Sequence, residues 1–276
     1  MNDNTLGYHQ GNSVIHHINA TAKLIFLLCI SIAAMTTYDT RYLIVISIIS
    51  ISLFKMSQLK WRQVSFVIKF IGFFTVINII AVYLFDPEYG VRLYDHRTVL
   101  LDGIGRFTVT SQELFYLCNL CLKYVSTVPL ALVFLMTTNP SHFAASLNKV
   151  GVNYKISYAV ALALRYIPDI QETYHNISLA QQARGFEMSS KASLLKRLKG
   201  ISHIVVPLIF SSLDRIDTIS TAMELRQFGH YKKRTWYVGQ KFNSIDYGVI
   251  VITVILLALA VVCFFINGGR FYNPWQ

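Results

Sequence analysis

Residues 178–229 read SLAQQARGFEMSSKASLLKRLKGISHIVVPLIFSSLDRIDTISTAMELRQFG, and this stretch organises the rest of the chain. It contains two long helical patterns, and each of them ends on an arginine. Arg184 closes the first in Ala183-Arg184-Gly185, and Arg226 closes the second in Ala222-Met223-Glu224-Leu225-Arg226. The region is strongly basic, because residues 184–234 hold ten Lys and Arg against four Asp and Glu. Since the flanking sequence is largely apolar, we expect a membrane anchor that presents two arginine-tipped helices on one side.

The composition is that of a membrane protein. Of the 276 residues, 54% are hydrophobic and only 14% are charged, whereas a soluble domain averages about 25% charged residues. The net charge of +11 fits loops that are kept on the cytoplasmic side of a membrane. No basic segment carries the interleaved aromatic residues of a single-strand binder. The composition therefore predicts the lipid bilayer as a partner and no nucleic acid.

Five apolar stretches are predicted to cross the membrane. The clearest is 247–269, which holds no charged residue in 23 positions, where about 20 suffice for a span. The other four stretches are 24–38, 42–54, 70–85 and 114–136. The first two of these form a tight helical hairpin in our interpretation, because one continuous helix would bury the charges of Asp39 and Arg41. The predicted fold class is an all-α membrane protein with about five transmembrane helices and a coupling region of long amphipathic helices.

The charges of the connecting segments predict the orientation. Residues 55–69 carry four basic residues and no acid, and residues 86–112 carry three basic and four acidic residues, so that both are interpreted as loops. With four spans before the basic region, residues 55–69 and 137–241 lie on one side, which the positive-inside rule identifies as the cytoplasm. The predicted domains are a transmembrane region at 1–136, a cytoplasmic coupling region at 137–241 and a C-terminal transmembrane helix at 242–276.

The start of the coupling region has a recognisable helix signal. Asn139 is suited to cap a helix and Pro140 to occupy its first position, so we expect a short amphipathic helix to about Val150. Residues 157–167 are apolar but contain Arg165 and are followed by a proline. This segment is too short and too charged to be predicted as a membrane span.

Lys123 is the one charged residue within a predicted membrane segment that we single out. It either marks a transport path or faces the helix bundle and bonds to a polar neighbour such as Asn119, one turn earlier. We favour the second interpretation, because nothing else nearby indicates a polar pathway.

The second long helix carries an apolar stripe at three- and four-residue steps. Its members are Ile201, Val205, Leu208, Ile216, Ile219 and Met223. Such a face contacts another protein or the bilayer, and packing of the two long helices on each other accounts for part of it.

The two arginines suggest a docking function. A guanidinium at a helix C-terminus interacts favourably with the helix dipole, and its planar fork matches a carboxylate. Gly185 is suited to be the left-handed residue that ends the first helix and leaves Arg184 protruding. Either arginine alone could be an ordinary helix end. Two of them in the one strongly basic region indicate a paired site.

Several motifs, in order along the chain, resemble the transmembrane T component of energy-coupling factor (ECF) transporters, the family that includes the cobalt-transport permease CbiQ. The motifs are Gly11-Asn12-Ser13-Val14-Ile15-His16 with Lys23-Leu24, Thr137-Thr138-Asn139-Pro140, Leu164-Arg165-Tyr166-Ile167-Pro168, Ala180-Gln181-Gln182-Ala183-Arg184-Gly185, Pro207-Leu208 and Ala222-Met223-Glu224-Leu225-Arg226. The resemblance implies a non-catalytic coupling subunit that binds two ABC-type ATPases and a substrate-binding S component. It also implies that the chain binds no cofactor of its own, because the ATPases hold the ATP.

The resemblance assigns ATPase binding to the two signatures, and the apolar stripe is interpreted as a face that contacts the S component or packs against the other helix. The ATPase-binding set is Ala183, Arg184, Gly185, Ala222, Glu224 and Arg226, with the two arginines as anchors. The family usually has glycine after the second arginine. Here Gln227 stands at that position and Gly229 follows two residues later, so that we expect a slight shift of the helix end.

Other functions are less consistent with the sequence. It contains no G-x-x-x-x-G-K-[ST] phosphate-binding loop, no cluster of metal-ligating residues and no catalytic constellation within the bilayer. The alternative function is a stand-alone secondary transporter, which predicts internal repeats and polar groups at the membrane midplane. We find no repeat, and Lys123 is the one midplane candidate. Within the resemblance, the cargo is a vitamin, a vitamin precursor or a transition-metal ion.

Overall fold

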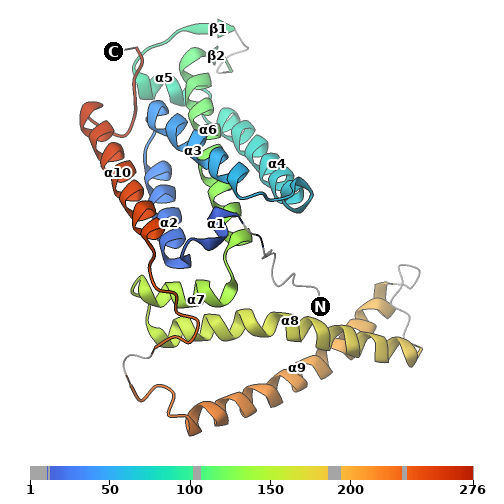
Figure 1. Ribbon diagram of the computed structural model, residues 1–276. Helices are drawn as coiled ribbons and strands as arrows, with labels where there is room; N and C mark the ends of the chain where they lie inside the picture. The colour runs from blue at the N-terminus through green and yellow to red at the C-terminus, as the bar shows by residue number, and fades with distance from the viewer. Residues whose placement is uncertain (1–10, 12, 102–106, 186–193, 232–234, 276) are drawn as a thin grey trace. The chain divides into compact units, whose positions relative to one another are not determined.

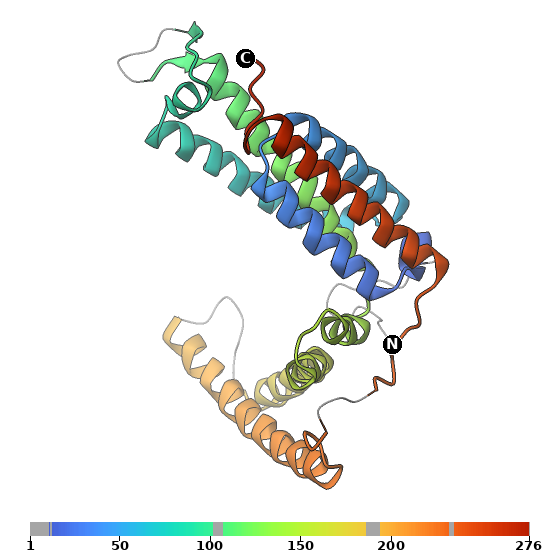
Figure 2. The same ribbon diagram turned by 90° about the vertical axis from the view of Figure 1, so that its left-hand side faces the viewer.

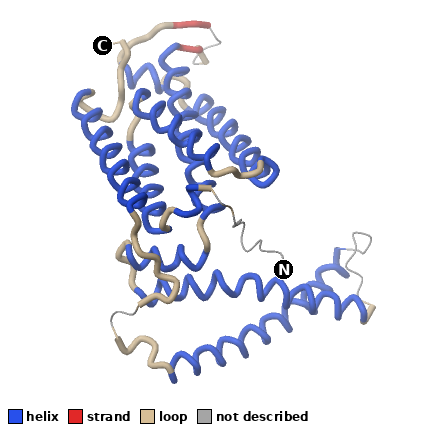
Figure 3. Tube along the Cα trace, in the orientation of Figure 1, coloured by secondary structure: helices blue, strands red, loops and turns tan. Residues whose placement is uncertain are grey.

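The computed structural model describes residues 11, 13–101, 107–185, 194–231 and 235–275, and most of them are helical (Figure 3). The chain divides into two compact units. The described part of the bundle unit lies within Gly7–Thr138 and Gln240–Gln276, and that of the hairpin unit lies within Asn139–Gly239. These divisions fall close to the predicted domain boundaries. The assignment of the units to functional domains stays a prediction.

Four helices form the core of the bundle unit and lie side by side in Figures 1 and 2. They are α2 (Ala20–Thr36), α3 (Thr40–Met56), α6 (Ser111–Thr137) and α10 (Ser244–Ile266). Helix α6 packs on α2 and α3, and α10 packs mainly on α2. The buried hydrophobic core draws on all four helices and consists of Ile30, Ala33, Tyr42, Ile46, Leu130 and Leu256.

Shorter elements and one long helix complete the bundle unit. Helix α1 (Val14–His17) precedes the core helices, and α4 (Trp61–Phe85) packs on α6. Helix α5 (Tyr89–Tyr94) also packs on α6. An antiparallel pair of short strands, β1 (Val99–Leu101) and β2 (Val109–Thr110), leads into α6.

The structure and the composition identify an all-α membrane protein. Within the described residues, three helical segments are long and apolar enough to cross a membrane: Val64–Phe85 of α4, the whole of α6 and the whole of α10. Helices α2 and α3 have 17 residues each, or about 25 Å at 1.5 Å per residue, against a hydrocarbon thickness of about 30 Å. Passage of these two helices across the bilayer stays a prediction.

Two segments that we predicted as loops are partly regular. Helix α4 begins at Trp61, so that the second half of segment 55–69 is helical. This half contains no proline or glycine, the helix tolerates its positive charges, and Val64 is fully buried there. Segment 86–112 contains α5 and both strands. Both loop predictions were wrong in these parts.

Lys123 is buried in the bundle, where its ammonium binds a helix end. Its Nζ donates to the carbonyl oxygen of Met35 at 2.7 Å and lies 3.2 Å from the ring centroid of Tyr38. Met35 belongs to the last turn of α2, where carbonyl groups lack partners within the helix. Asn119 instead accepts a hydrogen bond from the Thr40 hydroxyl at 2.7 Å. Lys123 thus faces the bundle as predicted, but Asn119 as its partner was wrong.

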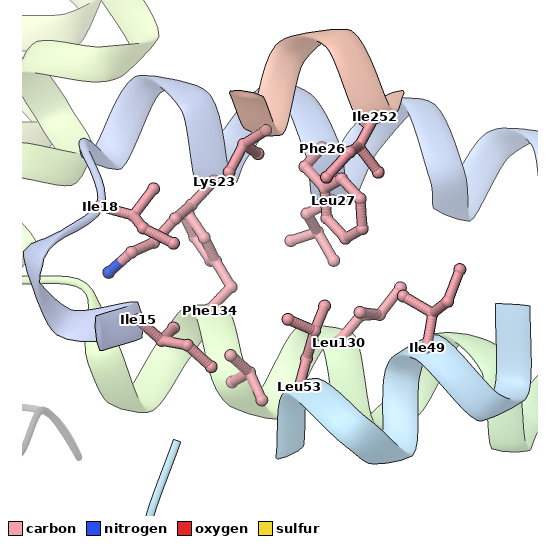
Figure 4. Close-up of a pocket in the computed structure, with 12 residues that line it drawn as sticks. Ile15, Ile18, Lys23, Phe26, Leu27, Ile49, Leu53, Leu130, Phe134 and Ile252 are labelled. Atoms are coloured by element: carbon pink, nitrogen blue, oxygen red, sulfur yellow. The ribbon is translucent and has the colours of Figure 1, made fainter. Parts of the chain in front are cut away.

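Lys23 joins the start of α2 to the end of α6 in a similar way. Its Nζ donates to the carbonyl oxygen and the hydroxyl of Thr137 at 3.0 and 3.3 Å. The Lys23 side chain also borders an apolar cavity of about 150 Å³ between α1, α2, α3, α6 and α10, with its nitrogen on the Ile18 side (Figure 4). Leu27, Leu53 and other aliphatic or aromatic side chains form the rest of the lining. Apart from Lys23, these lining side chains offer no hydrogen-bond partners to a water molecule.

The described part of the hairpin unit contains three helices. They are α7 (Pro140–Lys149), α8 (Tyr154–Ala183) and α9 (Leu194–Leu225), and α8 packs on both α7 and α9. The Asn139 side chain accepts a hydrogen bond from the Ser141 N–H at 2.9 Å, which confirms the predicted cap. Residues 157–167, which we treated as a separate apolar segment, are the first half of α8, since this helix continues through Pro168.

Asp39 connects the start of α3 to the C-terminal end of α10. Its carboxylate caps α3 by accepting from the Arg41 N–H at 2.9 Å, and it pairs with the Arg41 guanidinium at 3.1 Å. The Asn267 amide donates to it at 2.6 Å. Burial alone would raise the pKa of Asp39, but the hydrogen bonds from Arg41 and Asn267 hold this pKa below its ordinary value. The contribution of the carboxylate to stability is therefore complete at neutral pH and is lost as the pH falls through the lowered pKa.

We predict that Asp39→Ala lowers the free energy of unfolding by about 2–3 kcal/mol, because a helix cap is lost and the Asn267 amide loses its acceptor. Thermal or denaturant unfolding of the detergent-solubilised chain measures the change. Glu172, an exposed carboxylate of α8, supplies the control, and Glu172→Ala should change the value by less than about 0.5 kcal/mol. Equal losses for the two variants would contradict a structural role of Asp39.

Candidate functional site

Helices α8 and α9 contact each other in the hairpin unit and cross at an angle (Figures 1 and 2). Asp169 of α8 forms an ion pair with Arg215 of α9 at 3.1 Å. Towards the other end of the pair, the Gln181 amide donates to the carbonyl oxygen of His203 at 3.3 Å. The two helices are therefore antiparallel.

The contact between Gln181 and His203 depends on a proline. Pro207 lies inside α9 and has no N–H. The carbonyl group of His203, four residues earlier, therefore lacks the N–H donor that a helix usually supplies. The Gln181 side-chain amide of α8 donates a hydrogen bond to this carbonyl group instead. This gives a physical reason for the proline in the Pro207-Leu208 motif.

The first arginine stands directly at the end of α8. Arg184 follows the last helical residue, Ala183, and is exposed. Gly185 comes next with a φ of +84°, and its N–H donates to the carbonyl oxygen of Gln182 at 2.9 Å. Glycine adopts this left-handed conformation without steric cost. The prediction that Gly185 ends the helix is confirmed.

The second arginine stands at the equivalent position of α9. The Gln227 N–H donates to the Glu224 carbonyl oxygen at 2.8 Å, and the Phe228 N–H donates to the Met223 carbonyl oxygen at 2.9 Å. Together these bonds form the Schellman motif, with Gln227 as its left-handed residue at a φ of +53°. Arg226 therefore occupies the same cap position as Arg184. The expected shift of this helix end was wrong, because Gln227 itself adopts the conformation that glycine usually provides.

Aromatic contacts hold the second helix end against the start of α8. The Phe228 ring lies 5.2 Å from the Tyr154 ring and 4.7 Å from the Tyr158 ring, centroid to centroid. The Tyr154 hydroxyl accepts a hydrogen bond from the Gly229 N–H at 3.0 Å. The backbone that follows Arg226 is thus fixed by α8. The sequence analysis missed this contact.

The remaining residues predicted for ATPase binding lie beside the two arginines. Ala183, Ala222 and Glu224 are exposed in the last turns of their helices. The structure thus brings each predicted set together at one helix end. What these ends bind stays a prediction.

The predicted apolar stripe of α9 divides into two rows. One row faces α8: Ile204 is fully buried, and Arg215, Ile219 and Met223 follow it at helical spacing, as does Leu208. The other row is exposed and consists of Ile201, Val205, Ile209, Leu213 and Ile216. The predicted stripe thus contains residues of both rows and omits Ile204, and its contact with a partner stays a prediction.

We predict that Gln227→Gly raises the free energy of unfolding by about 1 kcal/mol, because glycine removes the steric cost of a side chain in a left-handed conformation. Thermal unfolding in detergent measures the change. The same substitution at Gln171, an exposed position inside α8, should lower the value by about 1 kcal/mol. A loss of stability in Gln227→Gly would contradict the role of Gln227 in the Schellman motif.

Comparisons with known proteins place the chain in a family. The family model described as CbiQ, cobalt transport protein, matches residues 11–237. An energy-coupling factor transporter transmembrane protein of Exiguobacterium sibiricum is 25% identical over 273 residues, which cover 96% of this chain and 99% of that protein. The protein of the same description from Staphylococcus aureus is 28% identical over 246 residues, or 85% and 87% of the two chains. The match therefore spans both arginine signatures, and the chain belongs to the CbiQ family of cobalt transport proteins.

Proposed function

We propose that the chain is the coupling subunit of an ATP-driven importer, in which Arg184 and Arg226 dock onto two ABC-type ATPases. Its relatives are energy-coupling factor transporter transmembrane proteins, and the chain is accordingly the transmembrane component of a transporter of this type. The observation that carries the finer proposal is the equivalence of the two helix ends. Both arginines are exposed, occupy the cap position and precede a left-handed residue.

This geometry suits binding to a carboxylate-lined groove on each ATPase. Each helix stops at its arginine, so that the arginine lies at the end of the helix rather than within it. A carboxylate can accept two parallel hydrogen bonds from such a guanidinium, which adds orientation as well as affinity.

The two long helices can carry movement away from these tips. Helix α8 has 30 residues and α9 has 32, which gives lengths of about 45–48 Å at 1.5 Å per residue. The ion pair between Asp169 and Arg215 and the bond from Gln181 join the helices at separate points along their length. A displacement imposed at one tip by ATP binding or hydrolysis would therefore move the pair as a unit.

The exposed apolar row of α9 is the surface that we assign to the S component. Ile201, Val205 and Ile216 are 47%, 38% and 54% exposed, and Ile209 and Leu213 continue the row. An apolar face on a helix is a common docking surface for another helix. In this assignment the S component selects the cargo, which is a vitamin, a vitamin precursor or a transition-metal ion.

The basic residues support a cytoplasmic position for the coupling region. Ten Lys and Arg lie within residues 184–234, and four more lie within residues 55–69. The positive-inside rule assigns both segments to the cytoplasm, where the ATPases work. The chain is non-catalytic in this proposal, since its sequence has no phosphate-binding loop and its partners hold the ATP.

We predict that Arg184→Glu and Arg226→Glu each reduce the ATPases recovered with the detergent-solubilised chain, and that the double variant reduces recovery at least about tenfold. Charge reversal replaces attraction to the partner's carboxylates by repulsion, and such contacts strongly affect complex lifetime. Co-expression with the two ATPase subunits, affinity purification of the chain and quantification of the bound ATPases provide the measurement.

Arg62→Glu is the matched control, because Arg62 is an exposed arginine of the bundle unit that undergoes the same charge change. Its recovery of ATPases should equal that of the unchanged protein. Undiminished recovery with the double variant would refute the docking assignment.

A further inference from the structure

A groove of about 390 Å³ lies beside the second arginine, entirely within the hairpin unit. Residues of α8, the end of α9 and the segment 235–238 line it. Its volume is in the range of ligand-binding clefts, about 300–1,000 Å³. The family resemblance assigns no role to this groove.

One side of the groove is an aromatic wall that is held in place. The Tyr158 ring lies 4.7 Å from the Phe228 ring and 6.3 Å from the Trp236 ring, centroid to centroid. The indole N–H of Trp236 donates to the Asn148 side chain at 3.1 Å, and the His142 ring bonds to the Val238 carbonyl at 3.0 Å. Helix α7 thus anchors the segment that carries Trp236, so that binding does not have to order this segment.

The groove also has a distinct charge. Its described lining includes Arg165 and Arg226 and no Asp or Glu. Asp169, one turn beyond Arg165 on α8, pairs with Arg215. Two cationic forks beside aromatic rings form a surface that matches a carboxylate next to an apolar or aromatic side chain.

The rim of the groove carries a fully exposed aromatic residue. Tyr237 lines the groove, and its relative exposure is 105%, which is that of a side chain free in solution. Tyrosine and arginine, with tryptophan, are enriched among the residues that dominate binding energy at protein–protein interfaces. The exposed Tyr237 ring therefore points to a protein partner rather than to a small free anion.

We propose that this groove receives an acidic segment of the ATPase that docks at Arg226, and that Arg165 is a second anion-binding group of the same interface. The inference rests on the proposed function and adds to it a binding site on this chain and the chemistry of the segment that fills it. The groove adjoins the proposed anchor Arg226, so that one partner can engage both. A lipid phosphate would use the same guanidiniums but would leave the aromatic wall and Tyr237 unused.

Photo-crosslinking tests the identity of the occupant. A benzophenone amino acid is placed at position 237 in the complete transporter complex, and the adducts are identified by mass spectrometry. We expect adducts with an ATPase peptide that contains Asp or Glu. Adducts confined to lipid, to the S component or to this chain, or no adduct at all, would overturn the proposal. Tyr231, which is 58% exposed and does not line the groove, is the control position and should give few such adducts.

Substitutions test the role of Arg165. We expect Arg165→Gln to raise the apparent Kd for the ATPases about tenfold, and Arg165→Lys to raise it less, because lysine keeps the charge but loses the planar fork. Tyr237→Ala should also weaken binding without a folding defect, because Tyr237 is fully exposed. Lys155→Gln is the control, because Lys155 is an exposed cation of α8 outside the groove lining.

The outcomes distinguish this inference from the proposed function. If Arg226→Glu lowers ATPase binding while Arg165→Gln and Tyr237→Ala do not, the docking proposal stands and the groove proposal fails. If none of the three affects binding, both proposals fail.

Discussion

The hydrogen bonds that end helices α8 and α9 are the constraint on which the proposed site depends. A helix can present an arginine at its tip only if the backbone turns away directly after it, and this turn requires a residue at positive φ. Gly185 and Gln227 provide the turn at the two ends. The side chains differ, but the bonds from Gly185 to Gln182 and from Gln227 to Glu224 are the same. Backbone geometry, rather than the identity of the residue after the arginine, makes the two ends equivalent.

The bundle unit uses a related device at its own helix ends. In a membrane, apolar side chains gain little by leaving lipid for protein, so that packing and polar contacts must hold helices together. Lys23 and Lys123 each donate to a carbonyl group in the last turn of a neighbouring helix, and Asp39 accepts from the first turn of α3 and from Asn267 beyond α10. These contacts join different helices through groups that a helix end leaves unpaired. They account for charged residues within or beside predicted membrane segments without a transport path.

Local signals in the sequence predicted the features that depend on a few neighbouring residues. The Asn139 cap, the left-handed Gly185 and the apolar helix α10 follow from residue type and spacing, and the structure contains all three. The predictions that failed concern how helices are rotated about their axes and where a later segment packs against earlier helices. Which residues of α9 face α8, and the partner that Lys123 reaches, depend on how helices are turned relative to each other, which spacing alone does not specify. The groove was missed because segment 235–238 returns to α7 and α8, far back in the sequence.

The proline of α9 has a consequence for how the two tips could communicate. Pro207 leaves the His203 carbonyl to Gln181, which lies three residues before Arg184. The hydrogen bond that α9 lacks at this proline is thereby replaced by a contact that fixes the position of the end of α8. A bend or straightening of α9 at this proline would therefore move the part of α8 directly before Arg184. The hydrogen bond between Gln181 and His203 thus makes the two arginines mechanically dependent on each other, although each one lies at the end of its own helix.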